Sequence, residues 1–329
     1  MMNHMKFIYV LTSSDSDYYL EQLAISIHSL RIYHPNAYIG VLVDKNTKRS
    51  FNGKRLNLLV QASEIIVVDT PPDFSQMQCS RFIKTSIRNL IDGDFLFIDT
   101  DTVICGNLLE LENYPEHIYA VPDLHVRISR HTHSYAIAAR ANVVKWDISN
   151  DPFYFNSGIV YVKDNTRTRE FYTIWNSLWQ ESTKLGCSSD QPAFCKANEI
   201  CGSIITELPG IYNCQVIENG VKFLKDAKVI HYFASNMGKL KNSSPFKLKD
   251  NLLYESIKQT GEISPEISHI IANPKNAFAD KIQLITECDV DFFNSPICQY
   301  LRKFYYKFPA FYEGLIKSIR TMKRKLHTA

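Results

Sequence analysis

The sequence lacks the patterns that mark several common classes of protein. Its eight cysteines include no CxxC pair and form no cluster, so we expect neither a zinc site nor a disulfide framework. This cysteine usage predicts a reducing, cytoplasmic location. The apolar run near the N-terminus, residues 7–11, is too short for a signal peptide or a membrane span. What remains is an ordinary globular composition, with 45% hydrophobic and 22% charged residues.

The net charge is only +3, but it is unevenly distributed. Residues 300–329 contain eight Lys or Arg residues and a single acidic residue, Glu313, which gives this segment a charge of +7 and leaves −4 for the rest of the chain. The basic character therefore belongs to the C-terminal tail.

Short apolar runs alternate with helical patterns in the first half of the chain. The runs are KFIYVL, YIGVLV, EIIVVD, DFLFID and IYAVPD. Runs rich in Ile, Val and Phe are typical of strands buried on both faces of a parallel sheet. Between the first two runs, residues 18–35 place Leu20, Leu23 and Ile27 on one helical face and end at Pro35. The alternation predicts βαβ units and an α/β fold.

Later segments continue this pattern before it changes. Residues 153–162 and 227–234 read as strands, and residues 168–182 read as an amphipathic helix between them. From about Pro245 the pattern becomes helical and irregular. We therefore expect two parts, residues 1–244 and residues 245–329.

Two carboxylates follow the fourth apolar run. In an extended chain, Asp99 and Asp101 point to the same side and Thr100 points to the other. Two carboxylates at the carboxyl end of a strand form half of an oxygen-rich metal site, and ligands bind at that edge of open α/β sheets. The alternative is that Asp-x-Asp only closes the strand by capping a turn.

A basic stripe lies just before this pair. Arg81, Lys84 and Arg88 occur at helical spacing, on the face opposite Ile83 and Ile87. Beside carboxylates that bind a metal, arginine is suited to phosphate or sugar oxygens. A solvated helix face explains the stripe equally well.

Three further segments complete a recognisable order. YFNSGIVYV (154–162), SSDQPAF (188–194) and VIHYFAS (229–235) follow FIDTD (97–101). Together they resemble the nucleotide-sugar glycosyltransferases of glycosyltransferase family 8, over roughly residues 6 to 240. The resemblance implies a GT-A fold, with a Rossmann-like, mostly parallel sheet flanked by helices. Residues 1–244 would form the catalytic domain, and residues 245–329 a helical extension with the basic, aromatic tail.

The resemblance implies a metal site and a donor site. Asp99, Asp101 and His231 match the residues that bind Mn²⁺, which holds the diphosphate of a UDP-sugar. One imidazole with two carboxylates favours Mn²⁺ over Mg²⁺. Without the resemblance, His231 would read as a core histidine at a strand end. The other implied residues are Asp190 and Gln191 near the anomeric carbon, and Thr12, Ser13, Tyr19, Arg81, Thr100, Asn156, Ser157 and Lys239 around the nucleotide sugar.

Local readings of these motifs remain open. Asn156 and Ser157 also suit a turn that starts a strand, and Asp190 suits a helix N-cap. Tyr19 suits either stacking on the base or a surface position. The chain departs from the family after His231, where Ala234 replaces the usual glycine and Lys239 comes about two residues late.

The expected function is metal-dependent transfer of a hexose, glucose or galactose, from a UDP-sugar to a surface-glycan or lipid-linked saccharide, as in lipopolysaccharide or other polysaccharide biosynthesis. The family retains anomeric configuration. Asp190 is a candidate nucleophile, but a front-face route that needs no enzymic base is favoured. The alternatives are a non-catalytic sugar-nucleotide-binding protein and a sugar-phosphate nucleotidyltransferase. The latter would normally have a Gly-rich loop after the first strand, and TSSDSDYY contains no glycine.

The C-terminal tail interleaves aromatic and basic residues. Segments of this kind bind anionic membrane surfaces, which predicts a peripheral enzyme on the inner face of the membrane. Packing of the tail on the catalytic domain is the alternative. No nucleic-acid-reading motif accompanies the charge, so no nucleic-acid partner is expected.

Overall fold

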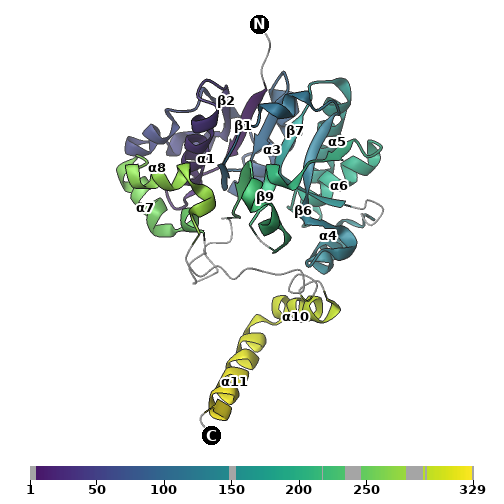
Figure 1. The fold of residues 1–329 in the computed structure, drawn as a ribbon. Helices are drawn as coiled ribbons and strands as arrows, with labels where there is room; N and C mark the ends of the chain where they lie inside the picture. The colour runs from purple at the N-terminus through teal and green to yellow at the C-terminus, as the bar shows by residue number, and fades with distance from the viewer. Residues whose placement is uncertain are drawn as a thin grey trace.

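A computed structural model describes residues 5–147, 153–216, 218–233, 246–278, 292 and 295–327 (Figure 1). The strands are β1 Lys6–Leu11, β2 Ile39–Asp44, β3 Glu64–Val68, β4 Phe95–Ile98, β5 Thr102–Ile104, β6 Ile118–Arg127, β7 Phe153–Val162, β8 Ile205–Glu207, β9 Cys214–Gln215 and β10 Val229–His231. The helices are α1 Tyr19–Tyr33, α2 Lys45–Ser50, α3 Gln76–Leu90, α4 Ser134–Val144, α5 Thr166–Lys184, α6 Gln191–Ile200, α7 Asn251–Thr260, α8 Pro265–Ala272, α10 Pro296–Lys307 and α11 Pro309–His327.

The main sheet has the strand order β3-β2-β1-β4-β7-β6-β8. Strands β3, β2, β1 and β4 pair in parallel, β7 runs antiparallel to both β4 and β6, and β8 is parallel to β6. The predicted α/β fold with a mostly parallel sheet is therefore confirmed. A small second sheet, β5-β10-β9, lies at the carboxyl end of β4.

Both faces of the main sheet are buried, as the continuous apolar runs predict. In β1, Phe7 and Tyr9 enter one core with α1 and the second sheet. Ile8 and Val10 enter the other core with α3, α5 and α6. Helices therefore cover the sheet on both sides (Figure 1). The carboxyl ends of strands such as β1 and β4 form an edge of the sheet that these helices leave uncovered.

Helices α7 and α8 pack on α1, and Tyr254 and Ile267 belong to the same core as α1. Helices α10 and α11 extend from this body (Figure 1), and α10 contacts it through Tyr306, whose ring lies 6.0 Å from His133 and 6.1 Å from Tyr135. The boundary at residue 244 remains a prediction.

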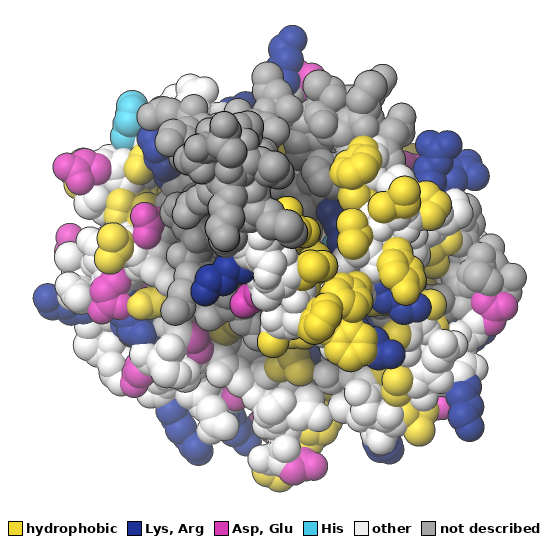
Figure 2. All heavy atoms as spheres, turned by 90° about the horizontal axis from the view of Figure 1, so that it is seen from below, with side chains coloured by type: hydrophobic (Ala, Val, Ile, Leu, Met, Phe, Trp, Pro, Cys, Tyr) yellow, Lys and Arg dark blue, Asp and Glu magenta, His cyan; other side chains and the backbone are white. Residues whose placement is uncertain are grey.

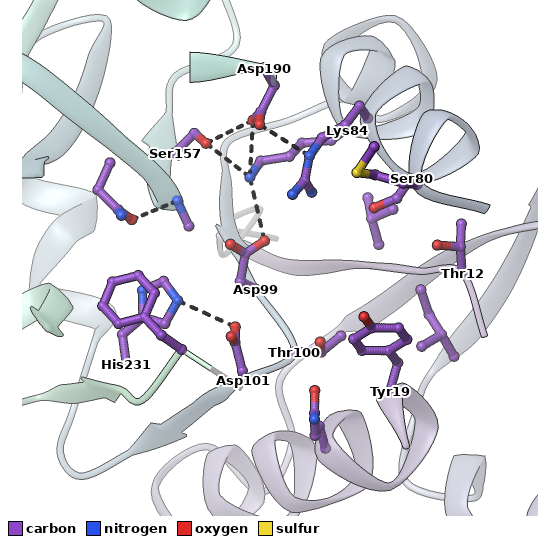
Figure 3. Close-up of a pocket in the computed structure, with 18 of the residues that line it drawn as sticks. Thr12, Tyr19, Ser80, Lys84, Asp99, Thr100, Asp101, Ser157, Asp190 and His231 are labelled. Atoms are coloured by element: carbon purple, nitrogen blue, oxygen red, sulfur yellow. Dashed lines mark hydrogen bonds and ion pairs between the residues drawn. The ribbon is translucent and has the colours of Figure 1, made fainter. Parts of the chain in front are cut away.

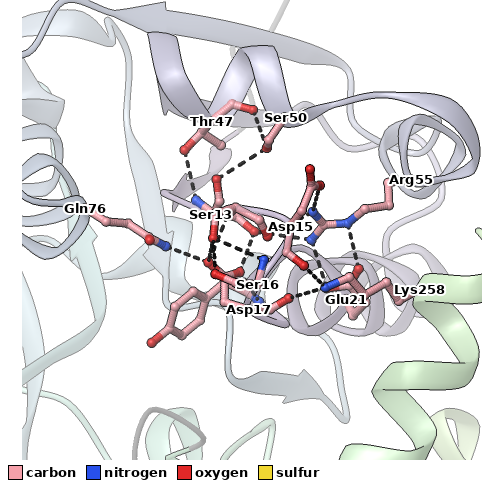
Figure 4. A network of polar contacts seen from close by, with 12 residues as sticks. Ser13, Asp15, Ser16, Asp17, Glu21, Thr47, Ser50, Arg55, Gln76 and Lys258 are labelled. Carbon is pink, nitrogen blue, oxygen red and sulfur yellow. Dashed lines mark hydrogen bonds and ion pairs between the residues drawn. The ribbon is translucent and has the colours of Figure 1, made fainter.

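The loop after β1 contains no glycine and is held by side chains instead (Figure 4). The Asp17 carboxylate accepts hydrogen bonds from Ser13 Oγ at 2.6 Å and from Gln76 Nε2 at 2.8 Å. Buried Arg55 donates to both carboxylate oxygens of buried Glu21, at 2.9 and 3.1 Å, and its Nη1 donates to the Ser14 carbonyl. These contacts fix the loop at the carboxyl edge of the sheet.

Candidate active site

A cavity of about 440 Å³ lies at this edge (Figure 3), within the size range of small-molecule sites. Its lining residues come from β1, α1, α3, the end of β4, β7, α6 and β10. They are Val10, Leu11, Thr12, Tyr19, Gln22, Gln76, Met77, Ser80, Arg81, Lys84, Asp99, Thr100, Asp101, Asn156, Ser157, Gly158, Asp190, Gln191, His231 and Phe233.

Asp99, Asp101 and His231 converge on one side of the cavity. Each offers a ligand atom within 4.8 Å of the other two, and His231 Nε2 lies 3.3 Å from Asp101 Oδ1. The second sheet brings them together, because β10 pairs antiparallel with β5 and sets His231 opposite Thr102. The sequence motifs identified all three residues, although 130 positions separate Asp101 from His231.

The residues around this cluster fit a bound cation. A Cβ atom on Gly158 would lie 2.5 Å from His231 Cε1 and 2.8 Å from Asp99 Oδ2, so only glycine lets these side chains approach each other here. The Gly158 carbonyl also accepts the backbone N–H of Asp99 at 2.8 Å. Two carboxylates and one imidazole form a donor set suited to Mn²⁺.

Thr100 lines the cavity together with both aspartates. The alternation expected of an extended chain does not hold here, because β4 ends at Ile98 and the chain bends before β5. Figure 3 shows Thr100 among the residues that line the cavity.

Asp190 occupies the N-cap position of α6, but its side chain forms no capping hydrogen bond. It faces Arg81 at 3.1 Å and Lys84 at 3.4 Å, and it accepts a hydrogen bond from Ser157 Oγ at 2.8 Å. Burial alone would raise the pKa of Asp190, but the charges of Lys84 and Arg81 outweigh it and hold the pKa well below its usual range. Asp190 is therefore an ionised carboxylate bound by cations.

The solvated-face interpretation of the basic stripe is wrong. Lys84 is 2% exposed, and its ammonium group reaches Asp99 at 3.4 Å and Ser157 at 3.0 Å as well as Asp190. Sequence reasoning named Lys84 in the stripe but did not place it in the site. The only signal was its i+3 spacing from Arg81.

Arg88 is also buried, but it serves another region. It is 0% exposed, donates to the Gly93 carbonyl at 2.8 Å and lies 3.5 Å from Asp164. These contacts hold the turn between α3 and β4, so Arg88 does not line the cavity.

Only some of the residues predicted to bind the nucleotide line the cavity. Thr12 and Tyr19 line it, although Tyr19 begins α1 instead of lying in the preceding loop. Burial, followed by the charges of Asp17 and Asp101, raises the pKa of Tyr19. Ser13 does not line the cavity and is bonded to Asp17. Lys239 lies outside the described residues.

The family model described as nucleotide-diphospho-sugar transferase matches residues 40–248, which is more than half of the chain. No curated protein matches this chain. Among solved structures, the galactosyltransferase LgtC in complex with donor and acceptor sugar analogues is 14% identical, with a TM-score of 0.54, and the match covers 81% of this chain and 100% of that one. At this identity the likeness shows the fold, which is GT-A as expected.

Other solved structures match with TM-scores below 0.5. Mouse xyloside xylosyltransferase 1 is 12% identical, with 70% of this chain and 98% of that chain covered and a TM-score of 0.47. The glycosyltransferase GlyE of Streptococcus pneumoniae is 15% identical, with 85% and 67% covered and a TM-score of 0.48.

Proposed function

Since this chain belongs to the nucleotide-diphospho-sugar transferase family and is a glycosyltransferase, we propose that it transfers a hexose from a UDP-sugar to a saccharide acceptor with a divalent ion at Asp99, Asp101 and His231. The main support is that these three side chains converge within 4.8 Å in the cavity at the edge of the sheet. The name of the LgtC structure, a galactosyltransferase, supports a hexose donor.

When bound, Mn²⁺ would supply a Lewis acid that stabilises the negative charge on a departing nucleoside diphosphate. Arg81 lines the cavity with its Nε 3.1 Å from Asp190, and its guanidinium would bind phosphate or sugar oxygens. Tyr19 and Thr12 would hold the uridine. Lys239 stays a proposed phosphate ligand from sequence alone.

The sugar would lie on the β7 and α6 side of the cavity. Asn156, Ser157 and Gln191 line it there, and Asn156 is 5% exposed. Gln191 is proposed to shield the sugar cation that develops as the bond to the diphosphate breaks.

The contacts of Asp190 support the front-face route to retention. A carboxylate that faces two cations and a hydroxyl donor is a poor nucleophile, because its lone pairs are already engaged. In the front-face route the bond from the anomeric carbon to the diphosphate oxygen breaks. The acceptor oxygen then bonds to the same face, and its proton passes to the departing phosphate.

A donor-hydrolysis assay tests the proposal. The full chain is incubated with Mn²⁺ and a panel of UDP-sugars, and released UDP and free hexose are measured. We expect slow hydrolysis of one or two hexose donors, and loss of this activity in Asp101→Asn. Asp69→Asn, at the exposed end of β3, is the matched control and should behave as wild type. No turnover of any donor, or tight UDP binding without transfer, would contradict a catalytic role.

For the acceptor, we propose a lipid-linked or surface glycan reached through peripheral contact with an anionic membrane. Figure 2 shows hydrophobic and basic side chains side by side on the face from which α10 and α11 extend. Tyr300, Tyr306 and Phe311 are 71%, 57% and 67% exposed on these helices, beside Lys303 and Lys307. Exposed aromatics flanked by cations suit the headgroup region of such a membrane.

Within the described parts of the chain, no helix combines the length and the hydropathy needed to cross a membrane.

A further inference from the structure

A chain of side-chain hydrogen bonds leads away from His231 behind the cavity. His231 Nδ1 lies 3.0 Å from Asn213 Oδ1, and Asn213 Nδ2 donates to Asn156 Oδ1 at 3.0 Å. Asn156 Nδ2 in turn donates to Asp123 Oδ1 at 2.8 Å. His231, Asn213 and Asn156 are 2%, 0% and 5% exposed, so water does not compete freely for these groups.

One backbone N–H group fixes the donor and the acceptor of each hydrogen bond between Asn156 and His231. The Gly158 N–H donates to Asn156 at 2.9 Å. Since a backbone N–H can only donate, the accepting atom must be the Asn156 oxygen. Asn213 must then direct its amide nitrogen at that oxygen, and its own oxygen must face His231. The hydrogen on the imidazole therefore belongs on Nδ1.

This tautomer leaves a lone pair on His231 Nε2, which lies 3.3 Å from Asp101 Oδ1. Two acceptors at that distance repel each other unless a proton or a metal cation lies between them. The ring has little freedom to turn away, because Phe233 stacks on it with centroids 4.1 Å apart and Gly158 abuts its edge. The arrangement is preset for a cation at Nε2.

We propose that Asn213, oriented by Asn156, is a positioning residue that holds His231 as the Nδ1–H tautomer and so presents Nε2 to the divalent ion. The inference rests on the metal role proposed for His231 and extends it to Asn213, which does not line the cavity. Partners of this kind orient the ring and raise its basicity as a ligand.

Metal affinity of the full chain gives the first test. Mn²⁺ binding is titrated by electron paramagnetic resonance, without nucleotide, in the wild type and three variants. Asn213→Leu keeps the size but removes both hydrogen bonds, and we expect it to weaken Mn²⁺ binding roughly 10- to 100-fold. Asn213→Asp keeps an oxygen acceptor for Nδ1–H and should recover part of the loss.

Asn198→Leu is the matched control for a folding defect. Asn198 is 1% exposed in α6 and accepts the Ile205 N–H at 2.9 Å, away from the chain of bonds to His231. It should lose stability but keep wild-type Mn²⁺ affinity below its melting temperature. Equal Mn²⁺ affinity in wild type and Asn213→Leu would overturn the inference while leaving the metal site itself intact.

The tautomer is also measured directly, without metal. ¹⁵N resonances of labelled histidines are recorded at about pH 8.5, above the ordinary imidazole range, and those of His231 are assigned by their loss in His231→Gln. We expect hydrogen on Nδ1 alone in the wild type and a mixture of tautomers in Asn213→Leu. A wild-type ring protonated at Nε2 would overturn the inference. The expected tautomer without any Mn²⁺ affinity would instead refute the metal role and leave the tautomer assignment standing.

Discussion

At the scale of single residues, the candidate site depends partly on residues that lie outside the sequence motifs. Asp99, Asp101, Asn156 and His231 could be predicted because they fall in ordered sequence motifs. Lys84 and Asn213 could not, because their roles come from contacts between distant segments. A lysine three positions after Arg81 and an asparagine before β9 carry no local signal. Only the folded chain buries both beside the same cavity.

Gly158 offers a sharp test at this scale. In Gly158→Ala, the new Cβ would press on His231 and Asp99, at 2.5 and 2.8 Å. We expect Mn²⁺ affinity to fall by about tenfold or more, since displaced ligands bind metal poorly. Gly314→Ala, with open space around its Cβ position, is the control. Titration of Mn²⁺ by calorimetry measures both, and unchanged affinity in Gly158→Ala would show that the three side chains do not act together.

Lys84 should support both the site and the fold. Its side chain is 3% exposed, and its ammonium group lies 3.4 Å from both Asp99 and Asp190. Lys84→Met removes the buried cation that these two carboxylates share and leaves Asp190 with only Arg81 and Ser157, which should lower the free energy of unfolding by about 3 kcal/mol. Urea denaturation measures the change.

Adding Asp190→Asn to Lys84→Met should recover part of this loss, because one of the two carboxylates that lost the lysine is then neutral. Lys184→Met, at an exposed position in α5, should change stability by no more than about 0.5 kcal/mol. A Lys84→Met variant as stable as this control would argue against the network around Asp190.

At the scale of elements, the apolar runs predicted β1, β2, β3, β4 and β6 to within a few residues. The runs of β1, β2 and β4 succeeded because strands buried on both faces need continuous apolar sequence, whereas β3 lies at the edge of the sheet and is only partly buried. The second sheet was not predicted as such, because β5 and β9 have only three and two residues. That sheet is nevertheless what brings His231 to the aspartates.

The irregular end of β6 makes the fold sensitive to acid. Leu124 and His125 have φ of 52° and 58°, and His125 Nε2 accepts the Gln215 N–H at 3.3 Å. Burial, followed by the charge of Lys222, lowers the pKa of His125 to about 4. The unfolded chain therefore binds this proton more readily than the fold does, near the ordinary pKa of about 6.5. Stability should fall as the pH drops from about 6.5 to about 4.

His125→Gln should make this fall shallower, because it removes the group that takes up the proton only on unfolding. Chemical denaturation of both proteins at several pH values across this window provides the measurement. If the free energy of unfolding fell equally with pH in the wild type and the variant, the pKa of His125 would not differ between the folded and unfolded states.

At the scale of the whole molecule, the cavity lies at the carboxyl edge of the main sheet, next to the small second sheet. Helices α10 and α11 extend from the body that contains this sheet (Figure 1). The basic and aromatic composition of these helices was evident from sequence. A helical extension was also expected there, and Pro296 and Pro309 stand in the first turns of α10 and α11, where proline is tolerated.

Membrane contact should depend on the charges of these two helices. Charge reversal of Lys303, Lys307 and Lys317, all exposed, should abolish sedimentation with vesicles containing phosphatidylglycerol while UDP-sugar hydrolysis in solution continues. Reversal of the exposed Lys48, Lys184 and Lys225 should leave vesicle binding intact. Equal loss in both triple variants would indicate that net charge alone governs binding.

The central claim is that Asp99, Asp101 and His231 together hold a divalent ion against a nucleoside diphosphate. Anomalous diffraction at the manganese edge, from crystals grown with Mn²⁺ and UDP, tests it most directly. The account predicts one manganese peak bounded by these three side chains, with the UDP diphosphate beside it in the cavity. UDP bound in the cavity with no manganese at these side chains would contradict it.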